Sequence, residues 1–153
     1  MSLVHLHLLL NHVPVVGALV ALILFAAALW LRDVVSTKFA LAFTAGLAVV
    51  AIAVYFTGEP AEEAVEHLAG VTKSAIHEHE EAAELTTIVI GVLGGLSLLA
   101  LLWLRSRRAP RWMAAAGVVG TLAVSALMGW TANLGGQIRH TEIQGATQNL
   151  YSD

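Results

Sequence analysis

The chain lacks cysteine and is poor in charge, and both features remove whole classes of function. None of its 153 residues is cysteine, 12% are charged and 58% are hydrophobic. Disulfides, thiolate metal sites, iron–sulfur clusters and covalent c-type haem attachment are therefore excluded. A soluble domain carries about 25% charged residues, so the chain is too apolar for an ordinary soluble globule. A net charge of −3 leaves no basic surface for nucleic acid, which we do not expect as a partner.

Four stretches are long and apolar enough to cross a bilayer, which takes about 20 residues. They predict spans at residues 12–32, 38–57, 82–104 and 111–133. Their apolar centres contain no charged residue, whereas the helices of a soluble bundle would show a polar stripe. We therefore expect an all-α integral membrane four-helix bundle, with the lipid bilayer as its solvent and one domain over 1–153.

Helical extensions are expected beyond the spans, in the outer loop 58–81 and ahead of the first span. The segment 3–10 is apolar but precedes that span, so it needs a packing partner. Pro60 can occupy the first turn of a short helix in the loop. Ser74 can begin the helix that continues into the third span. The bundle should then project a turn or two beyond the membrane.

Basic residues set the expected orientation. Six of the eight lie in the first and third loops: Arg32, Lys38, Arg105, Arg107, Arg108 and Arg111. The positive-inside rule places these loops in the cytoplasm, and both termini in the periplasm, for a multi-pass protein of a bacterial inner membrane. Ten of the eleven acids then lie outside, together with all seven histidines: His5, His7, His12, His67, His77, His79 and His140.

The spacing of these histidines and glutamates predicts a binding site. Residues three, four or seven apart share a helix face in three sets: His5 and His12; Glu63 and His67; His77, Glu80, Glu81 and Glu84. Facing helices build metal sites in bundle cores with such spacing. His12 is a candidate because it begins an apolar span. For the run 77–81, a solvated helix start is the alternative.

The end of the fourth span adds candidates. Gly135 and Gly136 permit a tight turn or a close backbone approach, which could fold Arg139 and His140 back over the outer end. Arg139 could then neutralise a haem propionate or pair with a glutamate. A helix C-cap followed by a trailing tail is the alternative.

The order of these motifs resembles a family of small bacterial four-helix membrane proteins of unknown function. That family opens with His-x4-His-x-Pro, has a histidine near the third span, and has a Gly-Gly turn with a basic–histidine pair after the fourth. The matching positions here are His7, His12 and Pro14; His77 or His79; Gly135, Gly136, Arg139 and His140. The usual phenylalanine after the second histidine is Val13. Such domains are sometimes joined to Rieske or cytochrome c domains, which implies redox work at the outer face and favours haem.

Three functions follow as hypotheses. The first is a b-type cytochrome-like electron-transfer protein that holds haem b between His12 and His77. Substitute or supporting groups would be His67, His79, His140 and Arg139. The second is a non-haem zinc, copper or iron protein. Its ligands would come from a larger set: His5, His12, Glu63, His67, His77, His79, Glu80, Glu81 and Glu84. The third is a structural subunit of a respiratory or photosynthetic complex.

The partners follow from these hypotheses. A periplasmic redox protein or a larger membrane complex would be the partner, and two copies of the chain could share one site as a homodimer. No nucleophile or acid–base pair identifies an enzyme. Histidine titrates near pH 6.5, so pH sensing is a secondary expectation.

Overall fold

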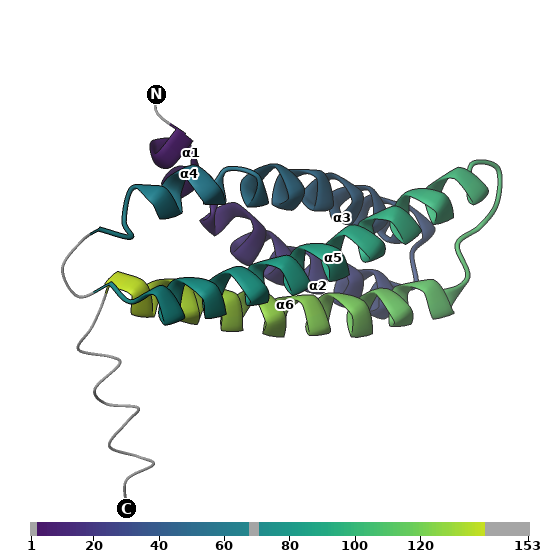
Figure 1. The fold of residues 1–153 in the computed structure, drawn as a ribbon. Helices are drawn as coiled ribbons and strands as arrows, with labels where there is room; N and C mark the ends of the chain where they lie inside the picture. Colours follow the sequence, from purple (N-terminus) through teal and green to yellow (C-terminus); the bar gives the residue numbers. More distant parts are fainter. Residues whose placement is uncertain (1–2, 68–70, 140–153) are drawn as a thin grey trace, which may run out of the picture.

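The computed structural model describes residues 3–67 and 71–139, and these form an all-helical bundle (Figure 1). Four of its helices are long and apolar enough to cross a membrane. They are α2 (His12–Leu31), α3 (Val34–Tyr55), α5 (Lys73–Trp103) and α6 (Arg111–Arg139). Two short helices complete the bundle, α1 (Leu3–Leu10) and α4 (Gly58–Glu63). The predicted all-α bundle with four helices that could span a membrane is thus confirmed.

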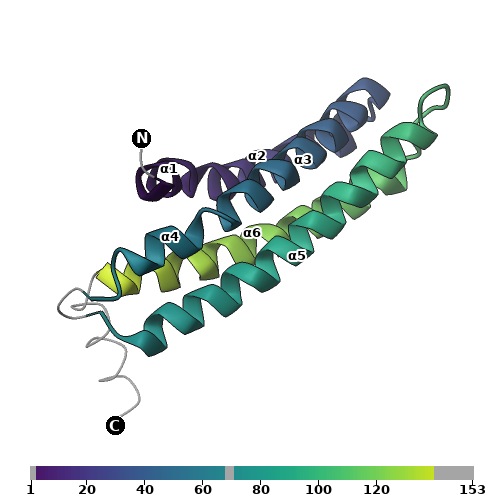
Figure 2. The same ribbon diagram turned by 45° about the horizontal axis from the view of Figure 1, so that its top comes forward.

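The four long helices pack in a ring. Both α2 and α5 pack against α3 and against α6, while α1 packs on α4 as expected (Figures 1 and 2). The α2–α3 and α5–α6 connections lie at one end, here named the arginine end for Arg32, Arg105, Arg107, Arg108 and Arg111. At the other end lie α1, α4, the start of α5 and the end of α6. This end is named the histidine end for His7, His12, His77 and His79.

Side-chain caps begin two of the helices. The carboxylate of Asp33 accepts hydrogen bonds from the backbone nitrogen and the hydroxyl of Ser36, both at 2.7 Å, and these bonds lower the pKa of Asp33. The hydroxyl oxygen of Thr72 accepts from the backbone nitrogen of Ala75 at 3.2 Å. Because Thr72 caps α5, this helix begins at Lys73. It therefore starts before Ser74 and well before the predicted span boundary at residue 82.

The last long helix also exceeds its predicted span. It continues through Gly135 and Gly136 to Arg139. The prediction of a tight turn at the two glycines is therefore wrong. A glycine is tolerated inside a helix where another group must approach its backbone closely. Gly135 meets that condition, because the ring of His79 lies against it.

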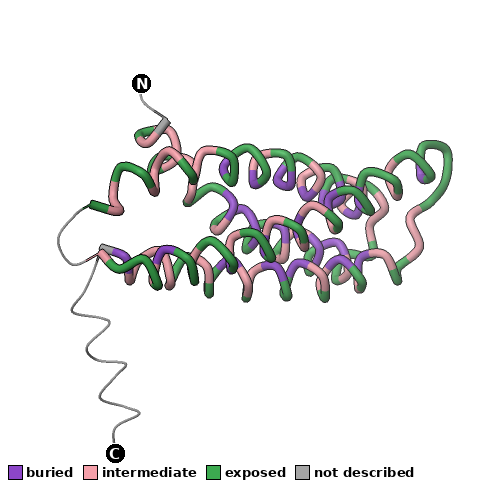
Figure 3. The backbone as a smooth tube through the Cα atoms, in the orientation of Figure 1, coloured by how far each residue is buried: buried purple, intermediate pink, exposed green. Residues whose placement is uncertain are grey.

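Alanines make up much of the interior of the bundle, beside a few large side chains such as those of Phe25 and Ile90. Ala21, Ala40 and Ala82 are fully buried, while large apolar side chains such as those of Ile23 and Val119 point outward. Figure 3 shows the buried positions on the faces that the long helices turn toward one another. Lipid tails are as apolar as leucine, so helices in a membrane associate through close packing rather than through hydrophobic burial. This pattern of burial suits a bundle surrounded by lipid.

We expect the packing of α3 on α5 to depend on Gly94 and not on its neighbour Gly95. A Cβ at Gly94 would collide with the Cβ of Ala48, whereas nothing lies within 4 Å of a Cβ at Gly95. Gly94→Ala should lower the free energy of unfolding by about 1–3 kcal/mol through overpacking. Gly95→Ala should be neutral or stabilising by up to about 1 kcal/mol, because alanine favours helix. Thermal unfolding in detergent, followed by circular dichroism, measures both. Equal loss of stability in the two variants would contradict this packing.

Candidate cofactor site at the histidine end

His79 turns from α5 toward α6. Its Nδ1 lies 3.0 Å from the backbone carbonyl oxygen of Thr131. A carbonyl oxygen can only accept, so Nδ1 of His79 carries a hydrogen and donates it. In the neutral ring, Nε2 then holds the lone pair that can bind a metal.

His7 on α1 is held in the same way by the end of α3. Its Nδ1 lies 3.0 Å from the hydroxyl oxygen of Thr57 and 3.3 Å from the carbonyl oxygen of Val54. The Thr57 hydroxyl donates its own hydrogen to the Val54 carbonyl at 2.6 Å, so its oxygen accepts from His7. Nδ1 of His7 is therefore also a donor, and Nε2 is again the nitrogen left for a ligand.

The two anchored imidazoles stand on helices far apart in sequence but lie within electrostatic range of one another. Within residues 3–67 and 71–139, neither Nε2 has a hydrogen-bond partner. Ligating histidines are commonly oriented by a hydrogen bond from one ring nitrogen to a carbonyl, which leaves the other nitrogen for the metal. Each of the two rings can thus offer its Nε2 to a ligand.

Helical periodicity explains why these two histidines face inward. His7, Asn11 and Pro14 have the i, i+4 and i+7 spacing of one helix face, although the chain turns at Asn11 between α1 and α2. Pro14 is buried, and the buried Oδ1 of Asn11 has no hydrogen-bond partner within the described residues. On α5, His79 shares its face with buried Ala82. His7 is missing from the ligands that the sequence predicts, and its spacing from Pro14 is the signal that could have identified it.

The surface of α6 is shaped to receive His79. A Cβ at Gly135 would lie 3.0 Å from Cε1 and 3.3 Å from Nδ1 of that ring. The hydroxyl oxygen of Thr131 lies 2.9 Å from that of Thr86, and it donates to the carbonyl of Ala82 at 3.2 Å. The missing side chain of Gly135 therefore gives the ring its space, and the threonine pair fixes the height of α6 against α5.

The two histidines of the expected axial pair are placed differently. His12 is exposed. The side chain of His77 is 70% exposed, and its Nε2 lies 3.4 Å from Oε1 of Glu81 on the same helix. Its Nδ1 lies 3.9 Å from Oε2 of Glu80. The face shared by His77 and these glutamates is thus a solvated face, which was the alternative for the run 77–81.

The other candidates are at the surface or outside the described residues. The side chain of His67 is 84% exposed, and its Nε2 lies 3.1 Å from Oε1 of Glu66. Arg139 ends α6, and its side chain, like the whole of His140, lies outside the described part of the chain. Within that part, no three or more histidine, aspartate or glutamate residues form a group that could hold a metal ion. The remaining exposed candidates are His5, Glu63, Glu81 and Glu84.

Two carboxyl groups link α4 to α5 beside this site. The side chains of Glu62 and Glu80 share a hydrogen bond, which together with partial burial raises the pKa of Glu62 from 4.5 to about 7. The charges of Glu66 and Glu59 add to the rise. Two carboxyl groups can hydrogen-bond only while one of them holds a proton. The contact between α4 and α5 is therefore strongest when Glu62 is protonated.

We expect this contact to make stability depend on pH. The unfolded chain loses the Glu62 proton near pH 4.5, while the folded chain keeps it to about pH 7. The folded state binds more protons in that window, so stability falls as pH rises through it and stays lower above it. Glu62→Gln should flatten this fall and raise the melting temperature at pH 8 by a modest amount, because the pair is partly solvated. Glu63→Gln, a change at the exposed neighbour, is the control. Melting curves from pH 4 to 8 with the same slope for Glu62→Gln and wild type would contradict the shared proton.

The sequence matches no family model, and no curated protein or solved structure is significantly similar to it. The resemblance to a family of bacterial membrane proteins stays a prediction. The function must be argued from the chain's own chemistry. That chemistry consists of two anchored imidazoles, an orphaned amide oxygen and a pair of carboxyl groups.

Proposed function

We propose that the chain is a membrane-embedded electron-transfer protein that holds a b-type haem between His7 and His79. The observation that carries the proposal is that these imidazoles stand on separate helices and are each oriented through Nδ1 by a backbone carbonyl. Haem iron takes four nitrogens from its macrocycle and needs two axial ligands, for which paired imidazoles are well suited. When bound, the group supplies one-electron exchange at iron. The proposed pair replaces His12 and His77.

A metal ion without a macrocycle is the second candidate. The Glu62–Glu80 pair favours it, because carboxyl groups beside His79 are ligands that iron or zinc accepts. Such an ion takes three or more protein ligands, however, and the described residues hold no group of that size. Haem needs only two ligands from the protein, which is the number of anchored imidazoles at this end.

We place the histidine end on the periplasmic face of a bacterial inner membrane. The support is the cluster of arginines at the opposite end, which the positive-inside rule assigns to the cytoplasm. Trp30, Trp103 and Trp112 are exposed at the arginine end, as in the aromatic belts of membrane interfaces. A haem at the histidine end would then lie within reach of a periplasmic redox protein.

Spectra of histidine variants test the ligand pair. The full chain is expressed with ample haem and purified in detergent, and its absorption is recorded oxidised and reduced. The wild type should show a Soret band that shifts on reduction. His7→Ala and His79→Ala should each lose the low-spin spectrum, because each removes one axial nitrogen. His12→Ala and His77→Ala, the matched controls, should keep it. Colourless wild-type protein would reject haem, and loss of the spectrum only in the two controls would restore the pair that the sequence predicts.

A pair of glycine variants tests the role of α6. Gly135→Val should push the His79 ring from its place, because even a Cβ would lie 3.0 Å from Cε1. Gly136→Val places the same side chain where nothing lies within 4 Å of a Cβ. We expect Gly135→Val to lower haem content at least severalfold and Gly136→Val to leave it near wild type. The haem-to-protein ratio is the measurement, with helical content as the check on folding. Full haem content in both variants would show that α6 does not position the ring.

A further inference from the structure

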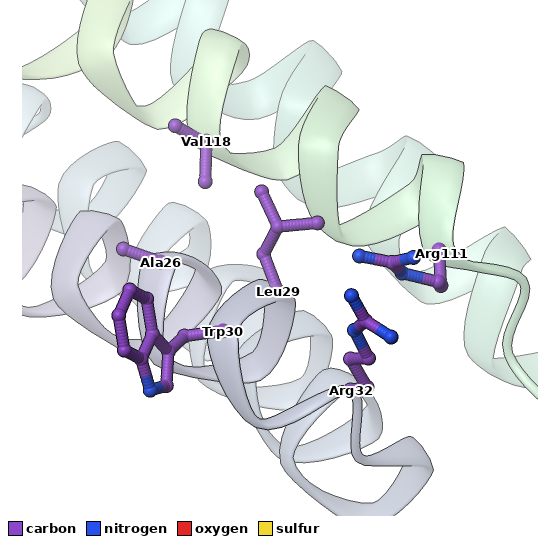
Figure 4. A pocket seen from close by; sticks show the side chains of 6 residues that line it. All are labelled: Ala26, Leu29, Trp30, Arg32, Arg111 and Val118. Atoms are coloured by element: carbon purple, nitrogen blue, oxygen red, sulfur yellow. The ribbon is translucent and has the colours of Figure 1, made fainter.

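A shallow cavity of about 330 Å³, wide open to the surroundings, lies between α2 and α6 at the arginine end, away from both inward histidines (Figure 4). It is lined by Ala26, Leu29, Trp30, Arg32, Arg111 and Val118. In Figure 4 the guanidinium groups of Arg32 and Arg111 approach one another at one side of the cavity, while Leu29 and Val118 form its apolar wall. The cavity therefore combines a doubly positive part with a hydrocarbon part.

The two guanidinium groups lack a neutralising partner. Neither forms an ion pair with any acid in residues 3–67 and 71–139. Asp33 is next in sequence to Arg32, but its carboxylate is taken up by the backbone nitrogen and hydroxyl of Ser36. Both arginines are exposed, and two positive charges that share a cavity repel one another. An anion bound between them would remove this cost.

Helix ends hold both arginines in place. Arg32 is the C-cap of α2, with φ 55° and ψ 34° in the left-handed region. This conformation costs a residue with a side chain about 1–2 kcal/mol, so the surrounding structure fixes it. Arg111 is the first residue of α6. Neither position can move far without unwinding its helix.

The position of the cavity along the helices indicates the kind of anion that it suits. Trp30 is 86% exposed and Trp112 65% exposed, as expected for residues at the level of lipid head groups. From that level, Leu29 and Val118 extend the cavity along the helices toward the middle of the membrane. A ligand that fills it needs a negative head at the arginines and an apolar tail beside them.

We propose that this cavity binds one anionic phospholipid, whose phosphate lies between Arg32 and Arg111 and whose acyl chain lies against Leu29 and Val118. Guanidinium groups bind phosphate through paired, charge-assisted hydrogen bonds. Basic pockets between helices on the cytoplasmic side are a recurrent way of binding such lipids. Inorganic phosphate shares the head chemistry but makes no use of the apolar wall.

Lipid binding to the full chain in detergent tests the proposal. Phosphatidylglycerol, phosphatidylcholine and inorganic phosphate are the probes, and native mass spectrometry counts bound lipid while thermal unfolding reports stabilisation. Arg32→Gln/Arg111→Gln should weaken phosphatidylglycerol binding by about tenfold or more, as the loss of a charge-assisted bond implies. Arg105→Gln/Arg108→Gln removes the same charge from the same end but not from the cavity. This control should bind as the wild type does.

A second variant tests the cavity without changing either arginine. Ala26→Trp fills the cavity and keeps both arginines, and Ala26 is exposed, so the change does not enter the core. It should also weaken phosphatidylglycerol binding. Unchanged binding in either cavity variant would overturn the proposal, as would equal binding of phosphatidylcholine. Stabilisation by inorganic phosphate as large as that by phosphatidylglycerol would show that a free anion, not a lipid, is the ligand.

Discussion

Inside an apolar solvent, a polar group must find its partner within the chain, because no water can supply one. The buried hydroxyls of Thr44 and Thr121 follow this constraint by donating to carbonyls one turn earlier in their own helices. Thr86 and Thr131 satisfy it between helices. His79 does the same when it donates Nδ1–H to the Thr131 carbonyl. The ring orientation that would suit a cofactor is thus set by the bundle's own hydrogen bonds, before anything binds.

The two ends of the bundle carry opposite chemistry, and this limits what each can bind. The arginine end offers positive charge beside hydrocarbon, which selects anionic amphiphiles. The histidine end offers imidazoles surrounded by glutamates, among them the exposed Glu59, Glu78 and Glu81. A redox partner that docks there would meet negative charge, and complementary charge would speed its approach. The partner of the proposed electron transfer should therefore present a basic surface.

The sequence predicts the spans and the clustering of arginines and histidines at opposite ends, because bilayer thickness and topology impose both. It does not settle which histidines face inward. His7 and His12 are five residues apart, so they point about 140° apart around a helix. Glutamates at ligand spacing favoured His77, but the same spacing describes a solvated face. The stripe of Ile76, His79 and Ala82 marks the inward face more reliably. The acceptor of His79 lies on another helix, where local sequence gives no signal.

The position of the two inward imidazoles relative to one another depends on α4, the shortest of the described helices. His7 stands on α1, which packs mainly on α4 and on the start of α2. His79 stands on α5, and the carboxyl pair of Glu62 and Glu80 is the contact that joins α4 to α5 there. A Cβ at Gly58, where α4 begins, would lie only 3.7 Å from Cε1 of His7. The short helix α4 thus begins close to one imidazole and is hydrogen-bonded to the residue that follows the other. A site built this way has one ligand on a long helix of the bundle and the other on a short helix at its end, so its geometry depends on how α4 holds the two together.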